Sequence, residues 1–457
     1  MRLAIEIMDY SLIASWLFLA GSVWGAWFTW NAYRPISDRP RLSVLSFFAG
    51  WLTTELALHH IAWQAVLTAG FLWLGALAHW PGRIALAVTL LSWAGLVGCL
   101  RAAWGSDDVV ERALQEGLGP EYRAHIRPDL AAATLAPRID WREILLPFPV
   151  RRPRSERIRD LRYARTAGQN LLLDVYRSNA RLTGCPVLLQ VHGGGWVIGS
   201  KNEQGLPLMR HLAERGWVCV SADYRLSPGA TFPDHLIDLK RAVAWIRTHI
   251  AEYGGDPDLL VVTGGSAGGH LASLVALTAN QAVYQPGFES VDTSVVACVS
   301  FYGVYDFTNR FGVWRHGGLR DVLERQVMKA ALDEAPEAYE AASPVARIHA
   351  GAPPFFVIHG ARDTLVPVEE ARRFCQAFRD TARAPIVYAE IPGAQHAFEI
   401  FPSLRTTFVL HGVERFLAHA IGHHREALAA AGAVWPGAGT YGYAGAGSES
   451  SPAAAGA

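Results

Sequence analysis

Four long apolar runs follow one another in the first hundred residues of the chain. They cover residues 11–30, 43–58, 61–80 and 84–100, and Glu55 is the only charged residue in them. Each run approaches the roughly 20 residues that a helix needs to cross a bilayer. Ten of the sixteen tryptophans lie between residues 11 and 104, several at the ends of runs, where aromatic side chains anchor at membrane interfaces. The pattern predicts an all-α transmembrane domain over residues 1–105 with four spans, with a buried soluble helical bundle as the alternative.

A different pattern begins near residue 155, where short apolar segments alternate with stretches of helical spacing. Leu171–Tyr176 and Trp217–Ala222 have strand character, and residues 236–253 have helical periodicity. Such alternation predicts an α/β fold with a mostly parallel, doubly wound sheet. We expect an amphipathic and basic linker over residues 106–154, a second domain over residues 155–424 with a cap at about 307–345, and an Ala/Gly/Ser-rich disordered tail over residues 425–457.

One Gly-x-Ser-x-Gly motif lies within this second domain. The apolar segment Leu259–Val262 precedes it, and a helical sequence begins at Ala267. A strand, a tight turn and a helix in this order project the side chain of Ser266 clear of the sheet, where it can act as a nucleophile. The alternative is an ordinary strand-to-helix turn.

A glycine loop follows another apolar segment of the same domain. His192 is followed by three consecutive glycines, and so much bare backbone indicates a close approach to a ligand. The N–H groups of Gly193 and Gly194, together with that of Ala267, are candidates for an oxyanion hole. A phosphate-binding loop is the alternative, but neither of the usual phosphate-binding glycine motifs is present.

A serine nucleophile also needs a base and an acid that orients the base. Asp363 follows the strand-like segment Phe355–Ile358, and His396 follows the next one along the chain. The order Ser, Asp, His is the order of an α/β hydrolase. His270 and His359 compete with His396 for the role of the base, but His270 would point along a helix and His359 precedes the turn.

Together these motifs resemble a known family. The segments 192–196 (His-Gly-Gly-Gly-Trp), 223–228 (Asp-Tyr-Arg-Leu-Ser-Pro) and 264–269 are similar to the hormone-sensitive-lipase branch of the α/β-hydrolase esterases, and especially to its bacterial membrane-anchored lipases and esterases. The resemblance covers residues 155 to 421 approximately. It implies an α/β-hydrolase fold with Ser266 as nucleophile, His396 as general base and then acid, and Asp363 orienting His396. The chain departs from the family at Gly265, where aspartate is usual, and at Pro228-Gly229, where Pro-Glu is usual.

The expected function is therefore that of a serine carboxylesterase or lipase that hydrolyses lipid-like acyl esters at a membrane. An acyltransferase or amidase could use the same triad, and a catalytically silent membrane scaffold is a third possibility. We expect no cofactor and no metal, because the five cysteines show no paired ligand spacing. Positive and negative charges balance at 41 each, which argues against a nucleic-acid partner. The expected partners are the acyl-ester substrate and membrane lipids.

Two features remain open at this stage. Glu55, His59 and His60 could form a polar site that receives a substrate head group or ties the helices together, or they could lie in the membrane interface. Trp314 and Phe311 of the cap could line an acyl pocket or simply pack in the core.

The chain is expected to be a multi-pass protein of a bacterial cell membrane. With four crossings, the arginines next to the spans place the second domain outside the cytoplasm by the positive-inside rule. The arginine-rich stretch 138–165 favours the opposite side, and three crossings would reverse the assignment.

Overall fold

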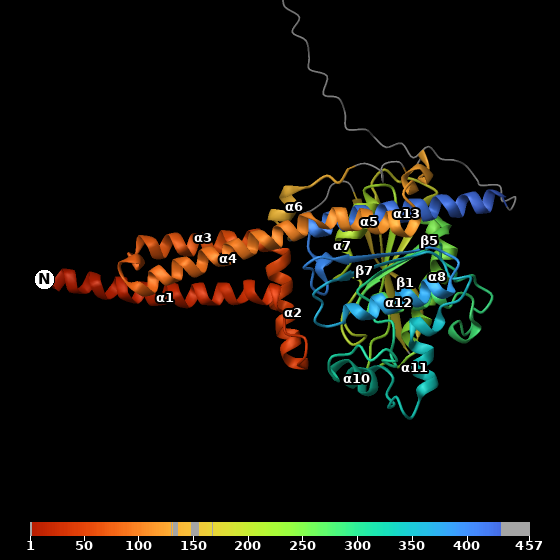
Figure 1. Cartoon of the computed structure of the whole chain (residues 1–457). Helices are drawn as coiled ribbons and strands as arrows, with labels where there is room; N and C mark the ends of the chain where they lie inside the picture. The colour runs from red at the N-terminus through yellow and green to blue at the C-terminus, as the bar shows by residue number, and fades with distance from the viewer. Residues whose placement is uncertain (1, 129, 131–135, 148–154, 167, 431–457) are drawn as a thin grey trace, which may run out of the picture.

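The computed structural model describes residues 2–128, 130, 136–147, 155–166 and 168–430. Within them, eight strands form one sheet in the order β1-β2-β4-β3-β5-β6-β7-β8 (Figure 1). β2 pairs antiparallel with β1 and β4, and the other neighbouring pairs are parallel, which confirms the predicted mostly parallel sheet. The strands are β1 (Ser155–Thr166), β2 (Gln169–Ser178), β3 (Cys185–Val191), β4 (Val218–Ala222), β5 (Gly255–Gly265), β6 (Cys298–Phe301), β7 (Phe355–Gly360) and β8 (Ile386–Ile391).

Helices cover both faces of the sheet, so its central strands are apolar on both sides. In β5, Leu260 and Val262 join the core on one face, and Leu259 and Val261 join the core on the other. The first face is covered by α8 (Asp234–His249), α9 (Ala267–Leu277) and α12 (Val368–Thr381). The second is covered by α5 (Ser106–Leu118), α7 (Leu206–Ala213) and α13 (Leu404–Ala430). This is the predicted doubly wound arrangement.

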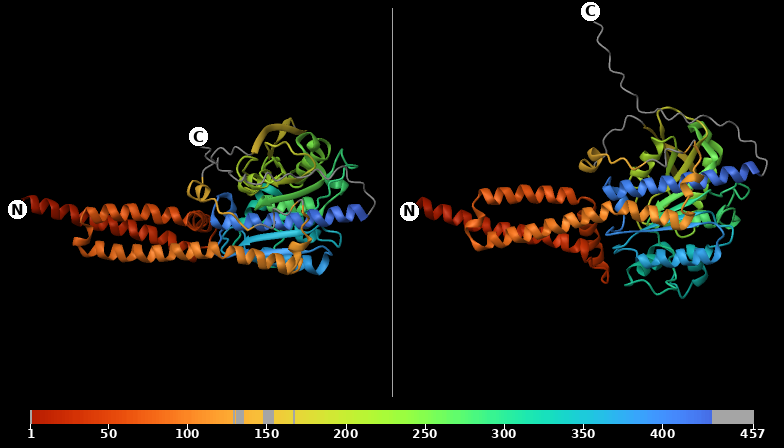
Figure 2. Two further views of the ribbon diagram at one scale, coloured as in Figure 1. Left: turned by 90° about the horizontal axis from the view of Figure 1, so that it is seen from above. Right: turned by 45° about the horizontal axis from the view of Figure 1, so that its top comes forward.

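The N-terminal helices form an elongated arm beside this domain (Figures 1 and 2). α1 (Arg2–Tyr33), α3 (Ala57–Trp73) and α4 (Trp80–Trp104) run side by side away from the sheet. α2 (Pro40–Glu55) lies across the base of the arm, against the α/β domain. Two helices in the described residues, Tyr10–Tyr33 and Trp80–Leu118, are long and apolar enough to cross a membrane.

This arrangement supports two of the four predicted spans, and the other two stay a prediction. The described residues contain two helices that meet the length and composition of a span, and α2 packs on the α/β domain instead of extending along the arm. Its hydrogen bonds to that domain, described below, explain why a short apolar helix turns away from its neighbours. Because the arginine count assumed four crossings, it no longer assigns the domain to one side of a membrane.

The expected linker, cap and tail contain helices in the described residues. Residues 106–118 of the expected linker form α5, whose Gly117 packs so closely on β8 that a Cβ there would lie 2.7 Å from Val387 Cγ2. A second part of this segment forms α6 (Trp141–Leu145). The cap contains α10 (Gly318–Val322) and α11 (Pro336–Ala342). α13 continues to Ala430, and the rest of the expected disordered tail lies outside the described residues.

Candidate active site

Four loops meet at one edge of the sheet. β3 leads into Gly193, β5 into Ser266, β7 into Asp363 and β8 into His396. Since these strands are parallel, their carboxyl ends share an edge, and loops far apart in the sequence come together there. The residues predicted for nucleophile, base, acid and oxyanion hole therefore all emerge at the same edge.

Ser266 occupies a strained turn between β5 and α9. Its backbone has φ 60° and ψ −123°, a conformation that typically costs about 1–3 kcal/mol and persists only where the surroundings impose it. Those surroundings exclude side chains on either side. A Cβ at Gly264 would lie 2.4 Å from the carbonyl oxygen of Gly268, and a Cβ at Gly268 would lie 2.2 Å from that of Val191. The glycines of the motif are thus required by the close packing around this turn.

Asp363 and His396 form a buried pair. Their Oδ2 and Nδ1 atoms are 2.6 Å apart, and both side chains are almost fully buried. The other carboxylate oxygen, Oδ1, accepts the backbone N–H groups of Leu365 and Val366, each at 2.8 Å. Burial alone would raise the pKa of Asp363, but the charge of His396 and the hydrogen bonds from His359 and His396 outweigh it and hold that pKa well below its ordinary value. An ionised Asp363 fixes the His396 ring with its Nε2 atom free to act as a base.

The two competing histidines have other partners. His359 Nε2 lies 3.3 Å from Asp363 Oδ2 and 3.0 Å from the carbonyl oxygen of Val366. It therefore helps to hold the Asp363 carboxylate in place. His270 accepts a hydrogen bond from the indole N–H of Trp196 at 3.1 Å, and its Nε2 lies 2.7 Å from the carbonyl oxygen of Ala342. Burial lowers the pKa of His270 to about 3, which keeps this bridge neutral.

Tyr302 lies between the turn of Ser266 and the ring of His396. No hydrogen bond between Ser266 and His396 occurs in the part of the chain that the structure describes. The Tyr302 ring lies 4.4 Å from the His396 ring between centroids, and a Cβ on Gly265 would come within 2.7 Å of the Tyr302 hydroxyl. The hydroxyl itself donates to Glu399. Tyr302 thus fills the space beside Gly265 where the family usually has aspartate, and no sequence motif pointed to it.

The glycine loop approaches Ser266 from β3. A Cβ on Gly193 would lie 3.2 Å from Ser266 Cβ, and a Cβ on Gly194, whose φ is 113°, would collide with the carbonyl oxygen of Ile198. The first N–H groups of a helix have no partner within it, so that of Ala267 points out of α9 beside Ser266. The N–H of Gly193, in contrast, donates to the side-chain oxygen of Gln204 at 2.6 Å. Of the three N–H groups predicted to form the oxyanion hole, that of Gly193 already has a partner, and those of Gly194 and Ala267 stay candidates.

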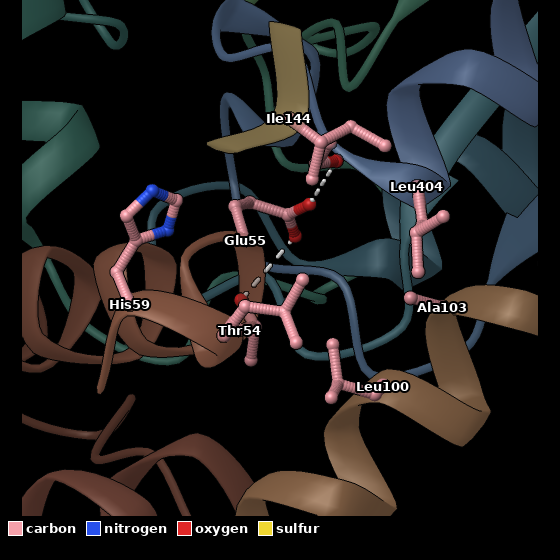
Figure 3. Close-up of a pocket in the computed structure, with 9 residues that line it drawn as sticks. Thr54, Glu55, His59, Leu100, Ala103, Ile144 and Leu404 are labelled. Carbon is pink, nitrogen blue, oxygen red and sulfur yellow. Dashed lines mark hydrogen bonds between the residues drawn. The ribbon is translucent and has the colours of Figure 1, made fainter. Parts of the chain in front are cut away.

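Glu55 is tied to the α/β domain, not exposed to a membrane or a substrate. Its carboxylate accepts hydrogen bonds from Arg405 of α13 and, at 2.7 Å, from Ser403, and the Glu55 and Arg405 side chains are fully buried. The cavity beside Glu55 (Figure 3) measures about 10 Å³, room for a single water at most. His59 Nε2 lies 3.0 Å from the carbonyl oxygen of Leu145. Of the earlier alternatives, the structure favours a connection between helices over a head-group site.

The aromatic residues of the cap have different environments. Trp314 donates its indole N–H to Glu370 of α12 at 2.6 Å, whereas Phe311 is 37% exposed. Burial raises the pKa of Glu370 to about 7. Trp314 is therefore anchored against α12, and its lining of an acyl pocket stays a prediction.

One cluster distant from these loops has the composition of a metal site. His211, His411 and Glu414 offer ligand atoms within 4.8 Å of one another. His211 Nε2 already lies 2.7 Å from Glu414, and Arg215 Nε lies 3.1 Å from the same carboxylate. The guanidinium satisfies the carboxylate and repels a cation, so the cluster is better described as an ion-pair network.

Known esterases are similar to this chain over most of its length. The BD-FAE family model matches residues 173–378. The probable carboxylic ester hydrolase LipM of Mycobacterium tuberculosis is 44% identical over 408 residues, which cover 85% of this chain and 90% of LipM. Esterase LipQ of the same organism is 42% identical over 337 residues, covering 73% of this chain and 79% of LipQ. Residues 155–457 make up only 303 of the 457 residues, so the match to LipM has to include part of the N-terminal helices.

A solved structure supports the fold as well. A truncated carbohydrate esterase from gut microbiota superimposes with a TM-score of 0.50 at 20% identity, covering 59% of this chain and 99% of that protein. The eight-stranded mixed sheet with helices on both faces is thus an α/β-hydrolase fold.

Proposed function

This chain belongs to the esterase family of its mycobacterial relatives LipM and LipQ and is a carboxylic ester hydrolase, and we propose that it cleaves acyl esters through the triad Ser266, His396 and Asp363. The observation that carries the proposal is the buried His396–Asp363 pair, 2.6 Å apart, at the sheet edge where Ser266 lies on its strained turn. Only the side chains of these three residues are needed for the chemistry.

In the first half of the reaction, His396 Nε2 takes the proton of Ser266 as Oγ bonds to the ester carbonyl carbon. The negative charge that develops on the carbonyl oxygen is stabilised by the N–H groups of Gly194 and Ala267, with Gly193 as a third donor if Gln204 releases it. The bond to the alcohol oxygen then breaks, and His396 returns the proton to the leaving alcohol.

In the second half, water takes the place of the alcohol. His396 accepts a proton from the water as its oxygen attacks the acyl carbon, and the bond to Ser266 Oγ breaks as the proton passes to Oγ. The products are a carboxylic acid and free enzyme. Throughout, the ionised Asp363 stabilises the imidazolium form of His396.

The test of this mechanism is hydrolysis of p-nitrophenyl butyrate by the detergent-solubilised chain. We expect Ser266→Ala and His396→Gln each to reduce kcat by at least about 10,000-fold. Ser273→Ala is the matched control. Ser273 lies on α9, the helix that begins directly after Ser266, and its hydroxyl donates to the carbonyl of Gly269. Full activity of Ser266→Ala would overturn the proposal, and an inactive wild type would favour the silent scaffold.

The arm of helices is proposed to anchor the enzyme in a membrane. Support comes from the length and apolar composition of Tyr10–Tyr33 and Trp80–Leu118 and from exposed tryptophans on the arm, such as Trp24 and Trp73. A membrane anchor in turn favours lipid-like esters as substrates. The chain should remain in the membrane pellet after an alkaline carbonate wash, and its release would contradict the anchor.

A further inference from the structure

One face of α2 forms a wall of the candidate active site, although the helix belongs to the N-terminal region. The backbone carbonyl of Ser43 accepts the hydroxyl of Thr364, the residue after Asp363, at 3.1 Å. The rings of Phe47 and His396 form a T-shaped contact with centroids 6.0 Å apart. Thus α2 contacts both the loop that carries the acid and the residue that serves as base.

The face of α2 next to this wall is apolar and exposed. Val44, Leu45 and Phe48 expose 45%, 61% and 50% of their surfaces. A row of exposed apolar side chains on one helix indicates a contact with lipid, a ligand or another protein. Because α2 lies across the base of the arm (Figures 1 and 2), a bilayer crossed by α1 and α4 would have α2 near its surface.

Between α2 and the cap lies a groove of about 580 Å³. This volume falls within the roughly 300–1,000 Å³ of typical small-molecule sites. Its lining is mostly apolar and consists of Pro40, Arg41, Ser43, Val44, Leu45, His316, Gly318 and Leu365.

The groove borders the loop that follows Asp363. Leu365 is one of its lining residues, and the backbone N–H of Leu365 donates to Asp363 Oδ1 at 2.8 Å. On the far side, His316 Nε2 lies 3.3 Å from the hydroxyl of Ser43, which connects the cap to α2. A chain lying in the groove would therefore run from the α2 surface toward the loop of Asp363.

We propose that this groove binds the acyl chain of the ester substrate, with the carbonyl group reacting at Ser266. The substrate class is then esters of long apolar acyl chains that enter from the membrane side of α2. This inference rests on the proposed function of Ser266 and adds a specificity site contributed by the N-terminal region. Of the eight residues that line the groove, one, Arg41, is charged. A lining with so little charge fits an acyl chain better than a polar head group.

The experiment measures kcat/KM of the full, detergent-solubilised chain on p-nitrophenyl butyrate and p-nitrophenyl decanoate. Val44→Trp and Leu45→Trp place a large ring in the groove. Each methylene excluded from an apolar site costs roughly fourfold in affinity, so excluding two lowers the decanoate-to-butyrate ratio by at least about tenfold. Phe48→Trp is the matched control on the same helix, because Phe48 is exposed but does not line the groove.

Leu45→Ala widens the groove and covers the case in which a tryptophan variant fails to fold. Its decanoate-to-butyrate ratio should rise or stay at the wild-type value, while those of the tryptophan variants fall. An unchanged ratio in both tryptophan variants, with butyrate still cleaved, would overturn the groove proposal and leave the triad intact. A wild type inactive on both esters would instead overturn the proposed function on which the groove depends.

Discussion

The buried ion pair between Glu55 and Arg405 provides a quantitative test of how the helical arm is joined to the α/β domain. The two side chains are fully buried, and Arg405 also donates to the carbonyl oxygen of Pro392 at 3.2 Å, in the loop that leads to His396. Replacing Glu55 by leucine would leave the guanidinium buried without a counter-charge. Breaking such a pair from one side costs about 3–5 kcal/mol.

This cost should be measurable as a change in melting temperature. In a domain of this size, 1 kcal/mol corresponds to roughly 2–4 °C in Tm, so Glu55→Leu is expected to lower Tm by about 6–20 °C. The double variant Glu55→Leu/Arg405→Met replaces both charges by apolar groups and should recover much of the loss, because removing the partner removes the uncompensated charge. Thermal unfolding of the detergent-solubilised chain, followed by circular dichroism, measures all variants under one condition.

An exposed ion pair serves as the control. Arg372 and Glu390 are 2.7 Å apart, but their side chains are 49% and 28% exposed. Arg372→Met should change the stability by about 1 kcal/mol at most. A Tm of Glu55→Leu within 2–3 °C of the wild type, or a double variant that loses the sum of the single losses, would refute the reasoning.

Three further predictions concern the catalytic loops. Asp363→Asn should lower kcat by about 10,000-fold with little change in KM, because the amide no longer fixes the tautomer of His396; a loss below tenfold in steady-state assays would contradict this. Gln204→Ala should leave kcat unchanged or raise it, because the variant frees the N–H of Gly193 to act as a third oxyanion donor, and a loss of kcat of about tenfold or more would contradict this. Burial raises the pKa of Glu399 to about 7. Between about pH 4.5 and 7 the folded state therefore binds more protons than the unfolded state, and the stability that this group contributes is lost as the pH rises through that window. Glu399→Gln should therefore match the wild-type Tm near pH 4.5 and exceed it above pH 8, and an equal Tm at both pH values would argue against a perturbed carboxyl.

The local parts of the site could be predicted from the sequence, and the long-range parts could not. The turn at Ser266 and the glycine loop at Gly193 are encoded within a few residues, because a buried strand followed by glycines permits few structures. The loops of Asp363 and His396 could be found from chain order, since each follows a strand.

The packing of α2 on those loops lacked any local signal. Ser43 and Thr364 are 321 positions apart, and Glu55 and Arg405 are 350 apart, so neither partner is identifiable from its neighbours in the sequence. The apolar composition of α2 fits a membrane span as well as a buried wall. That ambiguity produced the prediction of four spans, and the hydrogen bonds of α2 to Thr364, Ser403 and Arg405 favour the wall for this helix.

The most direct test of the central claim is the reaction of the purified chain with a fluorophosphonate probe, followed by mass spectrometry of the labelled peptide. Such probes bond covalently to an activated serine hydroxyl. We predict a single labelled peptide modified at Ser266, with labelling abolished in Ser266→Ala and strongly reduced in Asp363→Asn. A folded wild-type chain that remains unlabelled, or carries the label on another serine, would contradict the account.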